Sequence, residues 1–193
     1  MSTNAPIADR DTPVAPGSEQ LRPAGDRSGT RDRIRFELWI VPLVVILDQL
    51  AKALVRLYVP LHDVVPVAAG FLNLTHVQNT GAAFGLLNEA EFAYKRLVVA
   101  AFAAIALTGI GVFASRLPRQ DVMARVGLAL ILGGATGNLI DRVTAGAVVD
   151  FVDVVLGTWH FWAFNVADAA ITVGAGLVFL ELLLGNRHAS HSV

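Results

Sequence analysis

Residues 122–143 read VMARVGLALILGGATGNLIDRV, and this stretch decides the fold. It has the length of ~20 mainly apolar residues that a helix needs to cross a hydrocarbon core about 30 Å thick. Gly133 and Gly137 have the spacing of a small-xxx-small motif, which lets a neighbouring helix approach closely. Gly127 and Gly134 add further small surface. We therefore predict a membrane helix that packs against other helices through its glycines.

Three further apolar stretches have a similar length, at about residues 38–58, 96–115 and 163–184. The chain of 193 residues is 54% hydrophobic and 16% charged, with a net charge of −1 and no basic cluster outside its N-terminal region. Such a composition is unusual for a soluble domain and excludes nucleic-acid binding as a leading interpretation. The pattern indicates an α-helical integral membrane protein with four transmembrane helices.

Arginines flank the four stretches in a way that predicts their orientation. They precede the first stretch, separate the second from the third and follow the fourth: Arg31, Arg33, Arg35, Arg116, Arg119, Arg125 and Arg187. Because positive loops stay in the cytoplasm, both termini are expected to be cytoplasmic. The connections over about 59–95 and 144–162 then lie outside. The run FLNLTHVQ at 71–78 has β-forming residues and predicts a strand in a small extracytoplasmic sheet.

The two ends of the chain are polar. Residues 1–36 are rich in Pro, Gly, Ser and charged side chains, which predicts a disordered cytoplasmic tail. This region lacks the apolar core of a cleavable signal peptide. We expect residues 37–185 to form the membrane domain and residues 186–193 to form a cytoplasmic C-terminal tail.

Ionisable groups inside membrane helices cost at least ~2.5–3.5 kcal/mol each, so each needs a partner or a function. Asp48 and Lys52 lie four residues apart and either neutralise each other on one helix face or contact a substrate or lipid headgroup. Asn138, Asp141 and Arg142 share a face near the outer end of the glycine-rich span. There, Asp141 and Arg142 form a boundary ion pair, or the planar guanidinium of Arg142 binds acceptors such as substrate carbonyls or a lipid phosphate.

Two further acids lie beside the outer face. Asp150 belongs to the apolar run 148–155, which on its own predicts a strand at the membrane surface with solvated acids. Asp168 follows Asn165 by three residues, and a helix-capping box is the structural explanation for that spacing. If Asp150 and Asp168 converge, they share one proton near neutral pH, because two adjacent carboxylates resist double ionisation. One is then a base and the other an acid, which suffices to hydrolyse a peptide bond with water.

Other hydrolytic centres are disfavoured by the residue inventory. The chain has no cysteine and no His-Glu-x-x-His motif, and His62, His76 and His160 lack the spacing of metal ligands. Serine occurs only at positions 2, 18, 28, 115, 190 and 192, away from the predicted outer face. We therefore expect no metal site and no cofactor.

The chain resembles the lipoprotein signal peptidases, the bacterial signal peptidase II family, in five segments that occur in the family's order. These are Asp48-Gln49 with Lys52, Asn79-Thr-Gly-Ala-Ala-Phe84-Gly, Gly133-Gly-Ala-Thr-Gly-Asn138-Leu-Ile-Asp141-Arg142, Val149-Asp150-Phe151 and Phe164-Asn165-Val-Ala-Asp168. The resemblance implies four transmembrane helices, a small extracytoplasmic β-sheet cradle and a half-helix lid. It also implies a multi-pass protein of the bacterial cytoplasmic membrane with its active site at the extracytoplasmic face.

The resemblance implies an aspartyl endopeptidase that removes the signal peptide from diacylglyceryl-modified prolipoproteins by cleaving before the lipidated cysteine. It places the two catalytic residues at Asp150 and Asp168. Positions that support this pair or contact substrate and lipid are Asp48, Lys52, Asn79, Gly81, Asn138, Asp141, Arg142 and Asn165, with Asp141 in a structural role. The implied partners are the prolipoprotein substrate and membrane phospholipids, with no metal, no cofactor and no nucleic acid, and we expect the enzyme to act as a monomer.

Two features depart from the family pattern, and one alternative function stays open. The long N-terminal tail is not required by the family, and His76 stands where family members often have an aromatic residue. The alternative is a small membrane transporter or ion-coupled channel, since charges in or beside the spans can mark an ion pathway. Such a protein would tolerate the loss of Asp150 and would leave a prolipoprotein intact.

Overall fold

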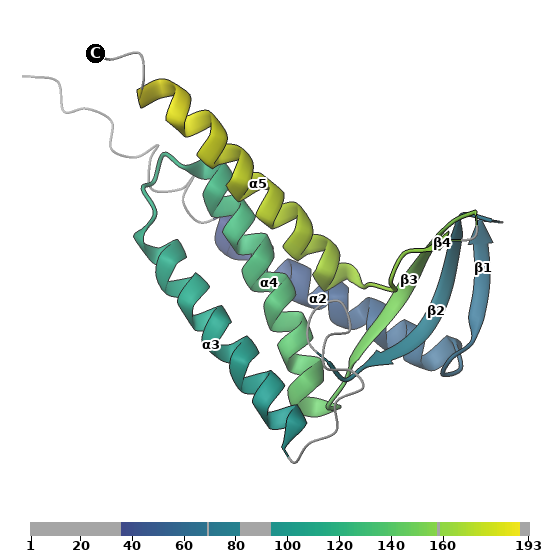
Figure 1. Ribbon diagram of the computed structural model, residues 1–193. Coiled ribbons are helices and arrows are strands. Elements are labelled where there is room, and N and C mark those ends of the chain that lie inside the picture. The colour runs from purple at the N-terminus through teal and green to yellow at the C-terminus, as the bar shows by residue number, and fades with distance from the viewer. Residues whose placement is uncertain (1–35, 69, 82–93, 158, 190–193) are drawn as a thin grey trace, which may run out of the picture.

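The computed structural model describes residues 36–68, 70–81, 94–157 and 159–189 and contains four helices and four strands in these ranges. Its elements are α2 (Phe36–Tyr58), β1 (Val64–Ala68), β2 (Leu72–Asn79), α3 (Lys95–Arg116), α4 (Val122–Thr144), β3 (Val148–Leu156), β4 (Trp159–His160) and α5 (Val166–Ala189) (Figure 1). The tail predicted over 1–36 lies almost entirely outside the described residues, as does the Ala82–Gly85 part of the second family-like segment.

The apolar stretches form helices close to the predicted bounds. Within the part of the chain that the structure describes, three helices are long and apolar enough to cross a membrane, namely α3, α4 and the Val166–Leu184 part of α5. The mainly helical membrane architecture is therefore confirmed. The fourth stretch forms α2, a helix of 23 residues that carries Asp48, Lys52 and Arg56 in its C-terminal half, so its passage through the bilayer stays a prediction. The last helix continues to Ala189, beyond the expected start of the C-terminal tail.

Helix α4 lies at the centre of the bundle and packs against the other three helices, two of them through its glycines (Figure 1). A Cβ atom at Gly127 or Gly134 would meet the backbone of α5. A Cβ atom at Gly133 or Gly137 would meet Val44 or the carboxylate of Asp48 on α2. The predicted close helix approach is thus confirmed, with one pair of glycines against α5 and one against α2.

Gly134→Val is expected to destabilise the bundle by about 1–3 kcal/mol, because the new side chain has to displace the carbonyl group of Ala167 on α5. Thermal unfolding in detergent micelles measures the change. Gly109→Val is the matched control, since a Cβ atom at Gly109 on α3 meets nothing within 4 Å. Equal unfolding temperatures for the two variants would contradict this account of the α4–α5 contact.

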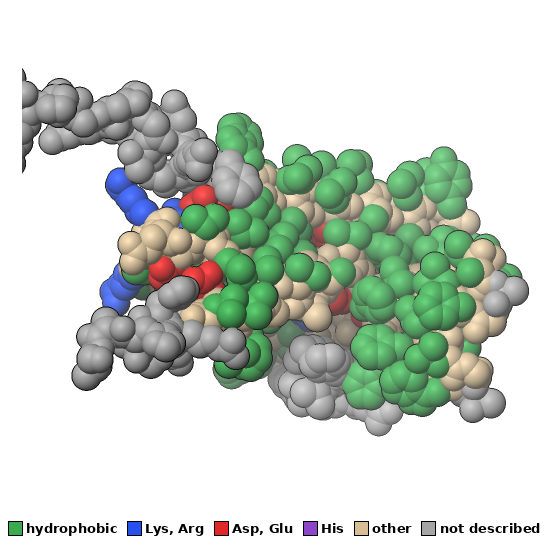
Figure 2. Space-filling model, turned by 90° about the horizontal axis from the view of Figure 1, so that it is seen from above, with side chains coloured by type: hydrophobic (Ala, Val, Ile, Leu, Met, Phe, Trp, Pro, Cys, Tyr) green, Lys and Arg blue, Asp and Glu red, His purple; other side chains and the backbone are tan. Residues whose placement is uncertain are grey.

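The ion pair between Glu37 and Arg125 shows that α2 and α4 begin at the same end of the bundle. Arg125 Nη2 lies 2.5 Å from Glu37 Oε1. The contact between Gly127 and Gly174 places the later part of α5 at this end as well. Charged side chains gather at this end, while hydrophobic side chains cover most of the opposite end (Figure 2). The sheet therefore lies at the end opposite to the start of α2.

The sheet is antiparallel throughout, in the order β1-β2-β3-β4, and extends sideways from the bundle (Figure 1). The strand predicted over 71–78 is confirmed as β2. A small core of Val55, Val59, Val149 and Phe151 attaches β3 to the C-terminal part of α2. Because β3 also pairs with β2, its first half is held on two sides, and this half carries Asp150.

Candidate active site

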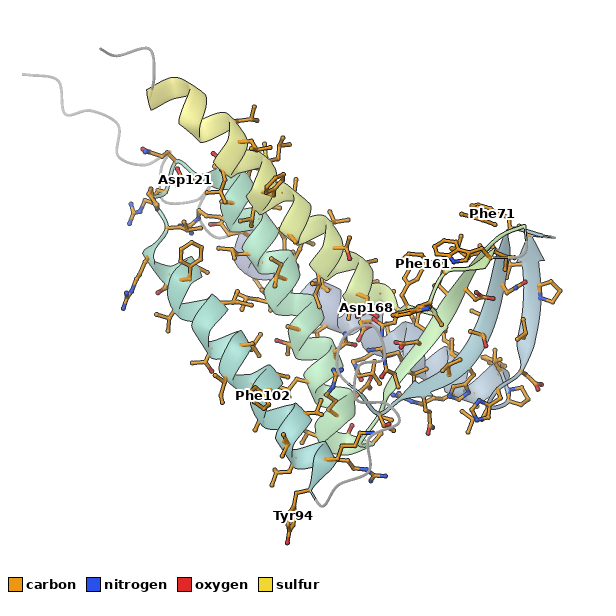
Figure 3. The ribbon with its side chains drawn as sticks, in the orientation of Figure 1. Phe71, Tyr94, Phe102, Asp121, Phe161 and Asp168 are labelled. Atoms are coloured by element: carbon orange, nitrogen blue, oxygen red, sulfur yellow. The ribbon has the colours of Figure 1, made fainter. Side chains whose placement is uncertain are left out.

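The N-terminus of α5 is closed by a reciprocal pair of hydrogen bonds between Asn165 and Asp168. The backbone N–H of Asp168 donates to Asn165 Oδ1 at 2.9 Å, and the backbone N–H of Asn165 donates to Asp168 Oδ2 at 3.3 Å. This is the capping box that the spacing predicted, with Asp in the place of the usual Glu or Gln. The box holds the carboxyl group of Asp168 at the point where α5 meets the sheet (Figure 3).

Asp150 lies on β3 with only 4% of its surface exposed. Its carboxylate accepts hydrogen bonds from Asn165 Nδ2 at 2.7 Å and from Asn79 Nδ2 at 3.2 Å. The strand predicted from the apolar run is correct, but the expectation of solvated acids is wrong, since Asp153 on the same strand is also buried at 9% exposure. The sheet and α2 exclude water from this strand, which the local sequence pattern does not show.

The side chain of Asn165 links the two aspartates, which lie eighteen residues apart in the chain. Its Nδ2 group donates to Asp150 and its Oδ1 atom accepts the backbone N–H of Asp168, while the backbone N–H of Asn165 donates to the Asp168 carboxylate. Asn138 on α4 completes the arrangement by donating from Nδ2 to Asp168 Oδ1 at 2.8 Å. The structure therefore brings Asp150 and Asp168 together in one network of amide donors. Within the described part of the chain, no three His, Cys, Asp or Glu side chains group as a metal site.

The pKa of Asp150 is raised from 3.8 to about 6, mainly by burial and additionally by repulsion from Asp168. The hydrogen bonds from Asn79 and Asn165 and the charge of Lys52 act against this shift. The difference corresponds to a cost of about 3 kcal/mol for ionising Asp150 in the folded protein. A carboxyl group with this pKa next to a second carboxyl group can exchange a proton with bound water near neutral pH.

Lys52 supports this network from the interior of the bundle. Its ammonium group is fully buried and lies 2.8 Å from each of three oxygens, Asp48 Oδ2, Asn138 Oδ1 and Asp141 Oδ2. The interpretation of Asp48 and Lys52 as a self-neutralising pair is confirmed, and the ammonium also orients the amide of Asn138. Since Lys52 can only donate, it fixes the carbonyl oxygen of Asn138 toward itself and the amide nitrogen toward Asp168. Asp48 in turn accepts the backbone N–H of Ala167 at 3.0 Å.

Asp141 and Arg142 point in different directions, so they do not form the boundary ion pair that was one alternative. Asp141 Oδ1 binds Arg56 Nη2 at 2.8 Å. Arg142 donates from Nη2 to the carbonyl of Gly81 at 3.2 Å and from Nη1 to the carbonyl of Asn138 at 3.3 Å. Consecutive residues of a helix lie on different faces, which separates the two side chains. Arg142 binds two carbonyl groups, the kind of acceptor that its planar shape suits.

Asn79 and Gly81 form the remaining side of the site. The backbone N–H of Gly81 donates to Asn79 Oδ1 at 3.0 Å, which leaves the Nδ2 group of Asn79 directed at Asp150. Two residues that were not among the predicted site residues also contribute, namely Gln49, which occurs in a family-like segment, and Arg56. Gln49 donates from Nε2 to the carbonyl of Gly137 at 3.1 Å and to Asp48 at 3.2 Å. Arg56 continues the four-residue spacing of Asp48 and Lys52, and this signal could have identified it.

Asn79→Ala is expected to move the alkaline limb of the pH–rate profile to higher pH. The lost hydrogen bond favours the charged form of Asp150, so its removal raises the pKa of this group above about 6. Activity that needs the shared proton then persists to higher pH. Measuring kcat/KM against pH for both proteins checks the direction. A limb displaced to lower pH, or not displaced at all, would show that Asp150 does not control it.

Comparisons with known proteins find relatives in sequence and in structure. The model of a family described as signal peptidase (SPase) II matches residues 40–184. The lipoprotein signal peptidase of Syntrophotalea carbinolica is 42% identical over 148 residues, covering 77% of this chain and 91% of the relative. That of Syntrophus aciditrophicus is 38% identical and covers 77% of this chain and 92% of the relative. Among solved structures, a bacterial membrane enzyme determined by the in meso method at 2.3 Å resolution is 32% identical, with a TM-score of 0.70, and the match covers 81% of this chain and 91% of that enzyme.

Proposed function

Because this chain belongs to the signal peptidase II family, we propose that Asp150 and Asp168 are the two carboxyl groups with which it cleaves its substrate. The enzyme is a peptidase that removes signal peptides from prolipoproteins. The alternative of a transporter or channel has no support from the relatives. The observation that carries the catalytic assignment is that Asn165 binds both carboxyl groups at once, that of Asp150 through its side-chain Nδ2 and that of Asp168 through its backbone N–H.

The proposed reaction needs no covalent intermediate. With one proton shared between the carboxyl groups, the ionised member takes a proton from a water molecule while the protonated member donates a hydrogen bond to the scissile carbonyl. The water oxygen attacks the carbonyl carbon, and the departing amine receives a proton as the bond breaks. Either aspartate can begin in the ionised state, because coupled acids titrate as a pair.

We place the catalytic pair at the extracytoplasmic boundary of the bacterial cytoplasmic membrane. In this arrangement α2 is the fourth span, both termini are cytoplasmic, and the sheet lies outside. The proposal is supported by the common end at which α2 and α4 begin and by the arginines that flank this end. A pair at the boundary receives water and still experiences the low polarity that raises the pKa of Asp150. We further propose that the enzyme acts as a monomer with phospholipids around its exposed apolar helix surfaces.

The proposed substrate carries a diacylglyceryl group on the cysteine after the cleaved bond. Burying acyl chains contributes ~0.8 kcal/mol per CH₂ group, which allows strong selection of lipidated over unmodified prolipoprotein. The outer surface of α3, with Leu97, Phe102 and Ile105 exposed, offers an apolar surface for such chains.

Incubation of the purified protein with lipidated and unlipidated forms of one prolipoprotein tests this proposal. We expect cleavage of the lipidated form alone, with mass spectrometry placing the new N-terminus at the modified cysteine. This test uses the wild-type protein and requires no substitution. An intact lipidated substrate, or equal cleavage of both forms, would refute the proposed substrate.

A further inference from the structure

The far end of the sheet carries five large exposed side chains, which we call the aromatic edge: Phe71, Leu156, Trp159, Phe161 and Trp162. Their exposed fractions lie between 46% for Phe161 and 63% for Trp162. Neither the catalytic network nor the core of the protein uses them. The sheet thus leaves unusually large apolar side chains uncovered at its far end.

The residues of the aromatic edge lie at the same end of the sheet. The backbone N–H of Val155 donates to the carbonyl of Phe71 at 2.8 Å, which places the turn between β1 and β2 beside the end of β3. Leu156 pairs with Trp159 across the β3–β4 ladder. The rings of Trp159 and Phe161 pack edge to face with centroids 6.0 Å apart. Figure 3 shows Phe71 and Phe161 at this same end of the sheet.

No charge interrupts this surface. The chain contains no Asp, Glu, Lys or Arg over residues 154–167 or over residues 64–88. All five residues of the neighbouring edge strand β1, Val64–Ala68, are exposed and uncharged. Hydrophobic side chains dominate this end of the molecule (Figure 2). A cluster of exposed apolar side chains of this kind marks an interaction site with a protein or a membrane.

We propose that the aromatic edge inserts into the outer interface of the bilayer and anchors the sheet there. The membrane spans already place a bilayer beside the protein, and the sheet extends sideways from the bundle at one end of these spans (Figure 1). Trp combines an apolar ring with one N–H donor, and it therefore concentrates at the boundary between hydrocarbon and water. Two tryptophans within four residues, flanked by Phe and Leu and free of charge, fit this boundary.

Anchoring the aromatic edge also fixes the depth of Asp150 relative to the membrane surface. This extension rests on the proposed function. Strand β3 carries Asp150 near its start and Leu156 at its end. Backbone pairing with β2 up to Val154, with one register shift between Leu74 and Val77, and then with β4 connects the two. A lipid-held edge therefore maintains Asp150 at a constant depth relative to the membrane surface, where the bond next to a lipid-anchored cysteine is presented.

Tryptophan fluorescence tests the anchoring without any assay of cleavage. The chain contains Trp39, Trp159 and Trp162, so Trp39→Phe/Trp162→Phe retains Trp159 alone and Trp39→Phe/Trp159→Phe retains Trp162 alone. Each variant is reconstituted as a single copy per lipid nanodisc. The nanodiscs contain phosphatidylcholine whose acyl chains carry bromine either near the headgroup or near the chain end. We expect the emission to lose most of its intensity with bromine near the headgroup and much less with bromine near the chain end. Acrylamide in the water should have little effect.

Strong quenching by acrylamide together with insensitivity to brominated lipid would show that the edge lies in water, and it would overturn the proposal. Protection from acrylamide only in vesicles crowded with protein would identify a second copy as the occupant and would also overturn it. The same measurements on Asp150→Asn protein separate this inference from the catalytic assignment, since quenching should be unchanged by that substitution.

The effect on catalysis is tested with Trp159→Gln/Trp162→Gln in lipid bilayers. We expect kcat/KM for lipidated substrate to fall about tenfold, from the lost interfacial burial of two side chains. Trp39→Gln, at the opposite end of α2, is the matched control and should keep its activity. The separate double variant Trp159→Phe/Trp162→Tyr should keep a kcat/KM close to that of the wild type, because the introduced Phe and Tyr side chains retain affinity for the interface. Unchanged kcat/KM in the double Gln variant would overturn the depth-setting role.

Discussion

Asp150→Asn and Asp168→Asn are each expected to lower the cleavage rate by ~10³-fold or more, with folding preserved. The amide has the shape of the carboxyl group and still offers an oxygen to the donors Asn165 and Asn138. It cannot take a proton from water, and it cannot share a proton with the remaining acid. The measurement is the single-turnover cleavage rate of lipidated prolipoprotein, with thermal unfolding of each variant recorded in parallel.

Asp153→Asn is the matched control for this prediction. Asp153 is a second buried acid on the same strand, and its carboxylate accepts a hydrogen bond from Asn73 Nδ2 at 3.0 Å. An amide oxygen can accept the same bond, so the variant should fold and retain most of its activity. Full turnover by either Asp150→Asn or Asp168→Asn would remove that residue from the catalytic pair. A loss of activity in Asp153→Asn equal to theirs would show that the assay reports strand integrity instead.

Lys52→Met is expected to destabilise the protein by about 3–5 kcal/mol, the range found when one partner of a buried ion pair is removed. Lys52 is fully buried, and its loss leaves Asp48 and Asp141 with one cation fewer. It also releases the amide of Asn138, which then no longer holds Asp168 in a defined position. The change is measured as the free energy of unfolding in mixed detergent micelles.

The double variant Asp48→Asn/Lys52→Met separates the charge effect from the orienting effect. Removing one acid along with the ammonium restores the charge balance with Asp141 and Arg56, so most of the lost stability should return. Activity should stay low, because nothing then orients Asn138 toward Asp168. If the single variant were as stable as the wild type, the buried ammonium would have no structural role. Recovery of activity in the double variant would contradict the role assigned to Asn138.

The sequence alone was sufficient to predict the helices and their manner of packing. A run of ~20 apolar residues has few alternatives to a membrane helix. The glycines of α4 predicted close neighbours, and they lie against α2 and α5 as expected. The spacing of Asn165 and Asp168 predicted the capping box, because its two hydrogen bonds depend only on residues three apart. These features are local, so periodicity and spacing contain the information that specifies them.

The tertiary structure alone decided which polar groups meet. The carboxylate of Asp150 looked solvated in its strand and is buried, because α2 and β2 cover β3 from two sides. Asp141 binds Lys52 and Arg56 rather than its neighbour Arg142. Each of these contacts joins elements that are far apart in the chain, at distances set by how closely α2 and α5 pack on α4. A buried polar group must find its partner in three dimensions, and residue spacing carries no record of which distant side chain that partner is.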